Sequence, residues 1–148
     1  MRKALLSLLL GFAALSSTVA QKTDKSAAVF STASGAIDGY DPVAYFTQNG
    51  PVKGQPDITY HWNGASWHFA SAANRDLFQQ SPEKYAPQFG GWCAYGWAKG
   101  YPAKIEPGAW SIVDGKLYLN YDLGVQKMWL KKQAEYIQKA VKNYAERK

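Results

Sequence analysis

Apolar and polar side chains alternate along two parts of the chain, and in each part a two-residue turn signal interrupts the alternation. The alternating runs are residues 58–62 and 66–70 around Asn63-Gly64, and residues 109–113 and 116–121 around Asp114-Gly115. A period of two is typical of strands, because successive side chains point to opposite faces. Asn-Gly and Asp-Gly favour tight hairpin turns, since these residues tolerate a positive φ. The pattern therefore predicts two β-hairpins.

Capping residues predict the helices. The expected helix starts are Asp41-Pro42 before a short helical turn, Ser71, Ser81-Pro82, and Asp122 before a long amphipathic helix toward the C-terminus. Ser and Asp accept hydrogen bonds from the first-turn N–H groups, and Pro fits the first helical position. Residues 85–101 are rich in glycine and aromatic residues, which predicts irregular, tightly bent backbone. Because no alternating parallel β-α-β units occur, the predicted fold class is α+β.

The first 20 residues have the composition of a cleavable signal peptide. A positively charged start precedes an apolar run over residues 4–15, and small residues follow at the expected cleavage point. The run is shorter than the roughly 20 apolar residues that span a bilayer. We therefore expect an exported chain, periplasmic or secreted, that does not span the membrane. Residues 21–36 are polar and small and are expected to be a flexible tether, which leaves residues 37–148 as one domain.

The charge balance argues against nucleic acid as a partner. The chain has 17 Lys and Arg residues against 11 Asp and Glu, and without residues 1–20 the balance is 15 against 11, a net charge of +4. Much of the excess lies on the predicted C-terminal helix, where a solvated polar face accounts for it. An arginine-rich stripe with stacking aromatic residues is missing from the sequence. We expect no nucleic-acid partner.

Several motifs, in this order along the chain, resemble the YHS domain family. They are Tyr40-Asp41-Pro42-Val43, residues 62–71 with the sequence WNGASWHFAS, and residues 81–85 with the sequence SPEKY. Residues 85–95 and 114–121 are similar to the exported, stand-alone branch of that family, so the resemblance covers nearly the whole mature chain. It implies a small α+β module related to treble-clef, TRASH-like metal-sensing domains and often associated with copper-handling proteins.

The chain departs from the metal-linked members of that family at their cysteines. Those members carry a Cys in place of Ala44 and a further Cys pair within the segment that matches residues 69–75. Here that segment has Ala70, Ala73 and Asn74 instead. The departure removes the soft thiolate ligands of those members. The implied fold therefore transfers better than the implied function.

The metal hypothesis rests on His68 and Cys93, with Asp41 from the neighbouring turn. Imidazole and thiolate together suit copper, and two or three ligands fit binding and transfer of Cu(I) better than structural zinc, which takes four. His61 and Met128 are weaker candidates. The expected function is metal handling with copper as the bound ion, and the expected partner is a metal ion or a metal-handling protein. We expect a monomer or a weak homodimer.

Two other functions stay open from the sequence. A metal-free binding module would use an aromatic, glycine-rich pocket for a small molecule or a peptide, although the same aromatic residues also suit a core. The aromatic residues considered for this pocket are Tyr40, Tyr45, Trp67, Trp92, Tyr95 and Trp97, and the ligand-binding residues predicted among them are Tyr40, Tyr45, Trp92 and Tyr95. Cys93 with His68 and Asp41 also has the residue types of a thiol enzyme, but no local signature supports catalysis, so we favour a protein that is not an enzyme. A buried, inert Cys93 is the alternative to each of these thiol roles.

Overall fold

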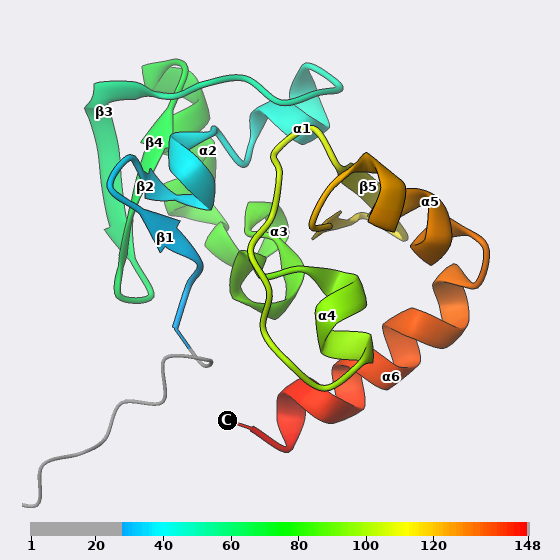
Figure 1. The fold of residues 1–148 in the computed structure, drawn as a ribbon. Coiled ribbons are helices and arrows are strands. Elements are labelled where there is room, and N and C mark those ends of the chain that lie inside the picture. Colours follow the sequence, from blue (N-terminus) through cyan, green and yellow to red (C-terminus); the bar gives the residue numbers. More distant parts are fainter. Residues whose placement is uncertain (1–27, 148) are drawn as a thin grey trace, which may run out of the picture.

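The structure, a computed structural model, describes residues 28–147 and confirms the α+β class. Within that range the strands pair as three separate two-stranded antiparallel sheets. The strands are β1 (Ser31–Thr32), β2 (Gly35–Ala36), β3 (Gln55–Trp62), β4 (Ala65–Phe69), β5 (Trp110–Val113) and β6 (Lys116–Leu119). The β3–β4 hairpin and α2 lie toward one end of the molecule, and β5, α5 and α6 lie toward the other (Figure 1).

Helices of one to four turns connect and cover these hairpins. They are η1 (Ile37–Gly39), α1 (Ala44–Thr47), α2 (Ala72–Gln80), α3 (Pro82–Tyr85), η2 (Gln88–Gly91), α4 (Ala94–Ala98), α5 (Leu123–Leu130) and α6 (Gln133–Ala145). Two predicted caps are confirmed by their hydrogen bonds. Ser71 Oγ accepts from the Asn74 N–H at 3.1 Å, and Asp122 Oδ1 accepts from the Val125 N–H at 2.7 Å. These bonds satisfy N–H groups that a helix start would otherwise leave unpaired.

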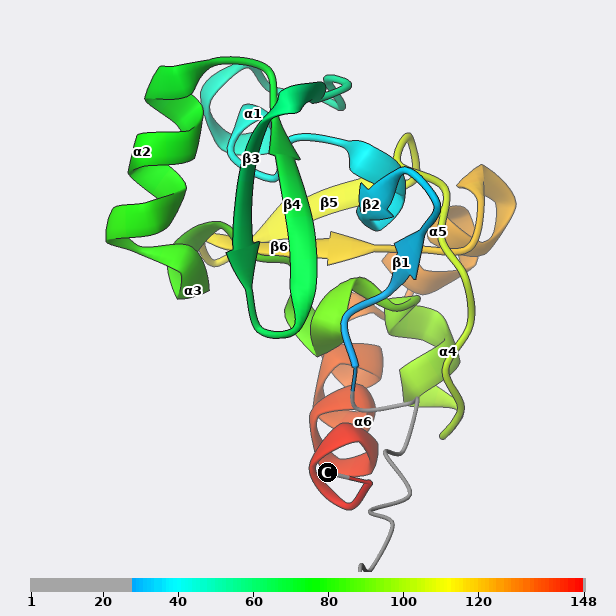
Figure 2. The ribbon, with the colours of Figure 1, turned by 90° about the vertical axis from the view of Figure 1, so that its left-hand side faces the viewer.

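Both predicted hairpins are confirmed. β3 and β4 meet at Asn63-Gly64, and β5 and β6 meet at Asp114-Gly115, with positive φ at all four turn residues. That backbone matches the right-handed twist of the flanking strands. In Figure 2 the β3–β4 hairpin crosses in front of the β5–β6 hairpin, and buried residues of β4 and β6 belong to the same core cluster.

The single long C-terminal helix predicted after Asp122 is wrong, because the chain forms two helices there. Lys132 leaves the helical region with φ −139° and ψ 42°, which separates α5 from α6. The Lys132 N–H still donates to Trp129 O at 3.2 Å, so the last turn of α5 is closed as the chain changes direction. The change of direction brings α6 against α4 (Figure 1).

The folded body begins before Ile37, so the predicted tether is wrong over residues 28–36. Val29 and Phe30 are only 8% and 9% exposed, and the Phe30 N–H donates to Gly90 O at 2.8 Å. The Phe30 ring packs edge-on against Trp92 with centroids 5.1 Å apart. Two apolar residues within a polar stretch are thus held by the glycine-rich loop. The predicted signal peptide and the tether residues 21–27 lie outside the described residues.

Two clusters of buried side chains form the core. The first lies between the hairpins and includes Trp67, Phe69 and Phe78, and the second lies between α4, α5 and α6 and includes Trp97 and Trp129. Within residues 28–147, no helix is both long enough and apolar enough to cross a bilayer.

Candidate functional site

Asp41, a predicted metal ligand, is a fully buried structural carboxylate. Its Oδ1 accepts hydrogen bonds from the N–H groups of Val43 at 2.8 Å and Ala44 at 3.3 Å. Its Oδ2 accepts from the Ala70 N–H at 2.8 Å and from Asn74 Nδ2 at 2.7 Å. The carboxylate therefore caps the turn into α1, as the sequence predicted, and ties that turn to the end of β4 and to α2.

Cys93 is buried, with 1% of its surface exposed. Its Sγ accepts from the Gly96 N–H at 3.4 Å and lies 3.7 Å from Asn120 Oδ1. Burial raises the pKa of the thiol, so at neutral pH it stays protonated. The thiol-enzyme hypothesis needs an accessible thiolate of lowered pKa, and this environment has the opposite properties.

His68 lies half-buried on β4 and packs against two glycines. A Cβ added at Gly35 would lie 3.0 Å from His68 Nε2, and one added at Gly54 would lie 2.5 Å from the His68 carbonyl carbon. Within residues 28–147, no group of three or more His, Cys, Asp or Glu side chains is arranged to hold a metal ion. The structure thus does not gather His68, Cys93 and Asp41 into one three-ligand site, and copper binding stays a prediction.

The four aromatic residues predicted to line a ligand pocket serve in separate places. Tyr45 is buried, its hydroxyl donates to Pro107 O at 2.9 Å, and its burial raises the pKa of the phenol. The Tyr40 ring lies under Lys53 Nζ, 4.8 Å from the ring centroid. Trp92 Nε1 donates to Ala28 O at 2.7 Å, and the ring of Tyr95 packs against that of Tyr136 with centroids 5.1 Å apart. None of the four lines the pocket that the structure forms between the β3–β4 turn and α6.

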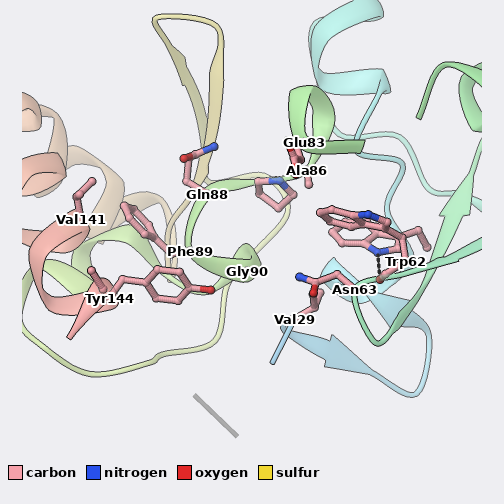
Figure 3. Close-up of a pocket in the computed structure, with 13 residues that line it drawn as sticks. Val29, Trp62, Asn63, Glu83, Ala86, Gln88, Phe89, Gly90, Val141 and Tyr144 are labelled. Carbon is pink, nitrogen blue, oxygen red and sulfur yellow. Dashed lines mark hydrogen bonds between the residues drawn. The ribbon is translucent and has the colours of Figure 1, made fainter. Parts of the chain in front are cut away.

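A pocket of about 400 Å³ opens between the β3–β4 turn and the C-terminal half of α6 (Figure 3). Apolar and aromatic side chains dominate its lining, and Glu83 is the single charged residue among them. The lining residues are Val29, Trp62, Asn63, Trp67, Glu83, Ala86, Pro87, Gln88, Phe89, Gly90, Val141, Tyr144 and Ala145. Pockets of this size and composition are typical of sites for small ligands.

Two aromatic pairs form facing walls of the pocket. On one side the rings of Trp62 and Trp67 have centroids 6.1 Å apart, and Trp67 Nε1 donates to Trp62 O at 3.1 Å. On the other side Phe89 and Tyr144 pack edge-on with centroids 5.6 Å apart. Burial raises the pKa of the Tyr144 phenol, so its hydroxyl keeps its proton. In Figure 3 the Tyr144 side chain extends from α6 toward Gly90 and the space between the walls.

The glycine-rich loop supplies part of the pocket lining through unusual backbone. Phe89, Gly90 and Gly91 have φ values of 58°, 65° and 82°, all in the left-handed region. A Cβ added at Gly91 would lie 2.7 Å from Ile37 Cγ2, so no larger residue fits there without movement. Phe89 adopts this conformation with a bulky side chain, which is strained. Such strain persists only where the surroundings hold it, and it often occurs at binding sites.

A second depression of about 360 Å³ adjoins the first. Its lining residues are Trp62, Gln80, Ser81, Pro82, Glu83 and Lys84. Because Trp62 and Glu83 line both depressions, the Trp62 side chain stands between them. A ligand longer than the first pocket would continue past this indole.

Of the residues that line the pocket, the sequence pointed to Trp67, which was one of the aromatic residues considered for a ligand groove, and missed the others. Trp62 was predicted only as the end of a strand, and Val141 and Tyr144 only as part of the long helix after Asp122. One signal was present, because Asn63-Gly64 fixes Trp62 at the tip of a hairpin, where an indole is seldom covered on both faces. The half-exposed Trp62 agrees with that position.

Comparison of the sequence and the structure with known protein families, curated proteins and solved structures found no match. The resemblance to the YHS domain family therefore stays a prediction. The evidence for a functional site is the geometry of the chain itself.

Proposed function

We propose that this protein is a binding module that holds a small, mostly apolar ligand with a flat ring between the β3–β4 turn and α6. The observation that carries the proposal is the pocket of about 400 Å³ with aromatic walls on both sides. Aromatic rings favour flat apolar ligands because stacked and edge-on contacts add to the burial of apolar surface. The proposed ligand therefore lies between Trp62 on the hairpin and Tyr144 on α6.

The polar groups of the pocket support a ligand that carries a few hydrogen-bonding atoms. Asn63 and Gln88 line it with side-chain amides that form no hydrogen bond within residues 28–147, so both are available to a ligand. An amide both donates and accepts, which suits a neutral polar substituent. A mostly apolar site with a few polar groups is the usual composition of a small-molecule pocket.

The rigid setting of the pocket also supports binding. Trp67 is 1% exposed and packs on Phe78 with centroids 5.2 Å apart, so the wall behind Trp62 is part of the core. The opposite wall stands on α6, whose Asn143 Nδ2 donates to Trp97 O at 2.9 Å. A preformed pocket loses little conformational entropy when a ligand enters, which favours affinity.

The test uses N-phenyl-1-naphthylamine, a neutral apolar dye whose fluorescence rises when it leaves water. The tested chain, residues 21–148, contains every core residue of the described fold and lacks the apolar run of residues 4–15. We expect saturable one-to-one binding. Val141 is 55% exposed and lines the pocket, so Val141→Arg obstructs the mouth without disturbing the core.

Gln138→Arg is the matched control, since Gln138 is an exposed residue of α6 that does not line the pocket. Binding lost in Val141→Arg and kept in Gln138→Arg supports the proposal. Absence of saturable binding, or equal binding by both variants, rejects this pocket as the ligand site.

A further inference from the structure

The outward face of α5 is more apolar than a solvated helix face normally is. Leu123 and Leu130 are 57% and 49% exposed, whereas Trp129 of the same helix is fully buried. Trp129 anchors α5 to the core through its contact with Tyr118, with centroids 5.5 Å apart. The helix is thus held by one face, and large apolar side chains protrude from the other.

Lysines share this outward face. Leu123, Lys127, Leu130 and Lys131 recur at spacings of four, three and one, which places them on one side of the helix. Lys127 and Lys131 are exposed, and neither forms an ion pair within residues 28–147. The sequence neighbour Asp122 is occupied as the cap of the helix, with its Oδ1 accepting from the Val125 N–H.

The residues just before α5 extend the same character. Tyr121 is 39% exposed, and Lys104 Nζ lies 5.1 Å from the centroid of its ring. A lysine on a tyrosine face is a cation–π contact that keeps the charge near an apolar ring. Two acidic residues lie nearby, the exposed Glu106 and the half-exposed helix cap Asp122, so the three lysines Lys104, Lys127 and Lys131 leave a local excess of one positive charge.

We propose that this face, composed of Tyr121, Leu123, Lys127, Leu130 and Lys131, docks on an anionic lipid surface. Exposed leucines interleaved with lysines are the pattern of helices that lie in the interface plane, where apolar side chains enter the acyl boundary and ammonium groups meet phosphates. The α5 helix then rests on the membrane without crossing it.

The size and charge of the face favour lipid over a protein. A helix of eight residues is about 12 Å long, whereas a stable protein interface buries about 800 Å² on each partner. A lipid surface needs no shape complementarity, so a short convex face is sufficient. A second copy of this chain is disfavoured because Lys127 and Lys131 of the two copies would face each other.

Docking through this face leaves the proposed ligand pocket open. That pocket is formed by the β3–β4 turn, the glycine-rich loop and α6. Within residues 28–147, no residue of α5 lines it. The lipid proposal therefore stands independently of the proposed function, and each can fail without the other.

The experiment is co-sedimentation of residues 21–148 with phosphatidylcholine vesicles that contain or lack phosphatidylglycerol. This chain is required because the apolar run of residues 4–15 would itself bind lipid. We expect binding to the anionic vesicles only, weakened by salt. Each lysine near an anionic surface contributes about fivefold in partition, so Lys127→Gln/Lys131→Gln lowers it roughly 25-fold. Leu123→Ser/Leu130→Ser is expected to lower it by at least tenfold.

Two control variants remove the same groups from other surfaces. Leu77→Ser/Tyr101→Ser removes two exposed apolar side chains, and Lys116→Gln/Lys142→Gln removes two exposed lysines. Both controls are expected to keep anionic-vesicle binding within about threefold of the parent chain, since neither changes the docking face.

Three results overturn the proposal. They are no binding to anionic vesicles, an equal loss in the control variants, and full binding by the Leu123→Ser/Leu130→Ser variant. A chain that binds neither kind of vesicle but binds polyglutamate, and loses that binding in Lys127→Gln/Lys131→Gln, has an acidic protein as its partner, which also overturns the lipid assignment.

Discussion

Replacement of Asp41 is expected to be among the most destabilising changes in the protein. Its buried carboxylate accepts four hydrogen bonds, from the N–H groups of Val43, Ala44 and Ala70 and from Asn74 Nδ2. Asp41→Ala leaves these donors without their acceptor in a site that is 0% exposed. A buried donor without a partner costs about 1–3 kcal/mol.

The magnitude follows from how many donors can find another partner. If water entering the space satisfies about half of them, two donors remain without a partner and Asp41→Ala costs about 2–6 kcal/mol in free energy of unfolding. Asn74→Ala removes one of the four bonds and is expected to cost about 1–2 kcal/mol. Asp41→Asn keeps the shape but turns an N–H₂ group toward neighbouring donors, so it is expected to fall between the two.

Urea unfolding followed by tryptophan fluorescence measures these differences in the metal-free chain, which contains six Trp residues. At about 4 °C per kcal/mol for a domain of this size, Asp41→Ala is also expected to lower Tm by about 8–24 °C. If Asp41 instead serves mainly as a copper ligand, Asp41→Ala costs no more than Asn74→Ala without metal. That result would refute the structural role argued here.

Three further predictions concern the thiol, the glycine-rich loop and the N-terminal edge of the fold. Native Cys93 is expected to react slowly with a thiol reagent. Because burial raises the pKa of its thiol in the folded state, the stability that the protonated thiol contributes is complete below about pH 8.5 and is lost as the pH rises. In Cys93→Ala this decrease in the free energy of unfolding is expected to be missing up to the pH at which the tyrosines ionise. Gly91→Ala is expected to lower the free energy of unfolding in urea by about 3 kcal/mol, because Gly91 has φ 82° and the added Cβ would lie 2.7 Å from Ile37 Cγ2. Gly64→Ala, at φ 74° but in open space, is expected to lower it by about 1 kcal/mol. Phe30→Ala is expected to lower the free energy of unfolding by about 2–4 kcal/mol, because the ring is buried. An unchanged unfolding midpoint in this variant would restore the tether interpretation for these residues.

The features that the sequence predicted correctly are those determined by adjacent residues. Asn63-Gly64 and Asp114-Gly115 specify hairpin turns through their own φ preferences, and Ser71 and Asp122 cap helices through N–H groups three residues away. No long-range information is needed for any of these features, which is why the α+β class and most element starts were predictable.

The features that it missed depend on packing between distant parts of the chain. Trp129 and Ala140 are both buried and lie in phase with one helix, so periodicity gave no sign of the break at Lys132. No Gly or Pro marks that break. Phe30 lies in a polar stretch, and its burial depends on the distant glycine-rich loop, where Gly90 O accepts its N–H and Trp92 packs against its ring. Sequence patterning cannot bring such positions together.

Trp62 and Trp67 line the pocket and also pack with the aromatic core, so ligand binding can be measured as an increase in the stability of the folded chain. Trp62 packs on both Trp67 and Phe78, with centroids 6.1 Å and 5.7 Å apart, so a ligand against its exposed side adds contacts to a ring that the core already holds. A ligand that binds only the folded chain stabilises it by about 2.7 kcal/mol at a hundred times its Kd. Because Val141 is exposed and outside the core, Val141→Arg separates a ligand-dependent rise in Tm from a change in intrinsic stability. A compound that raises Tm in the parent chain and not in this variant therefore occupies the pocket, and a compound that raises Tm equally in both acts elsewhere.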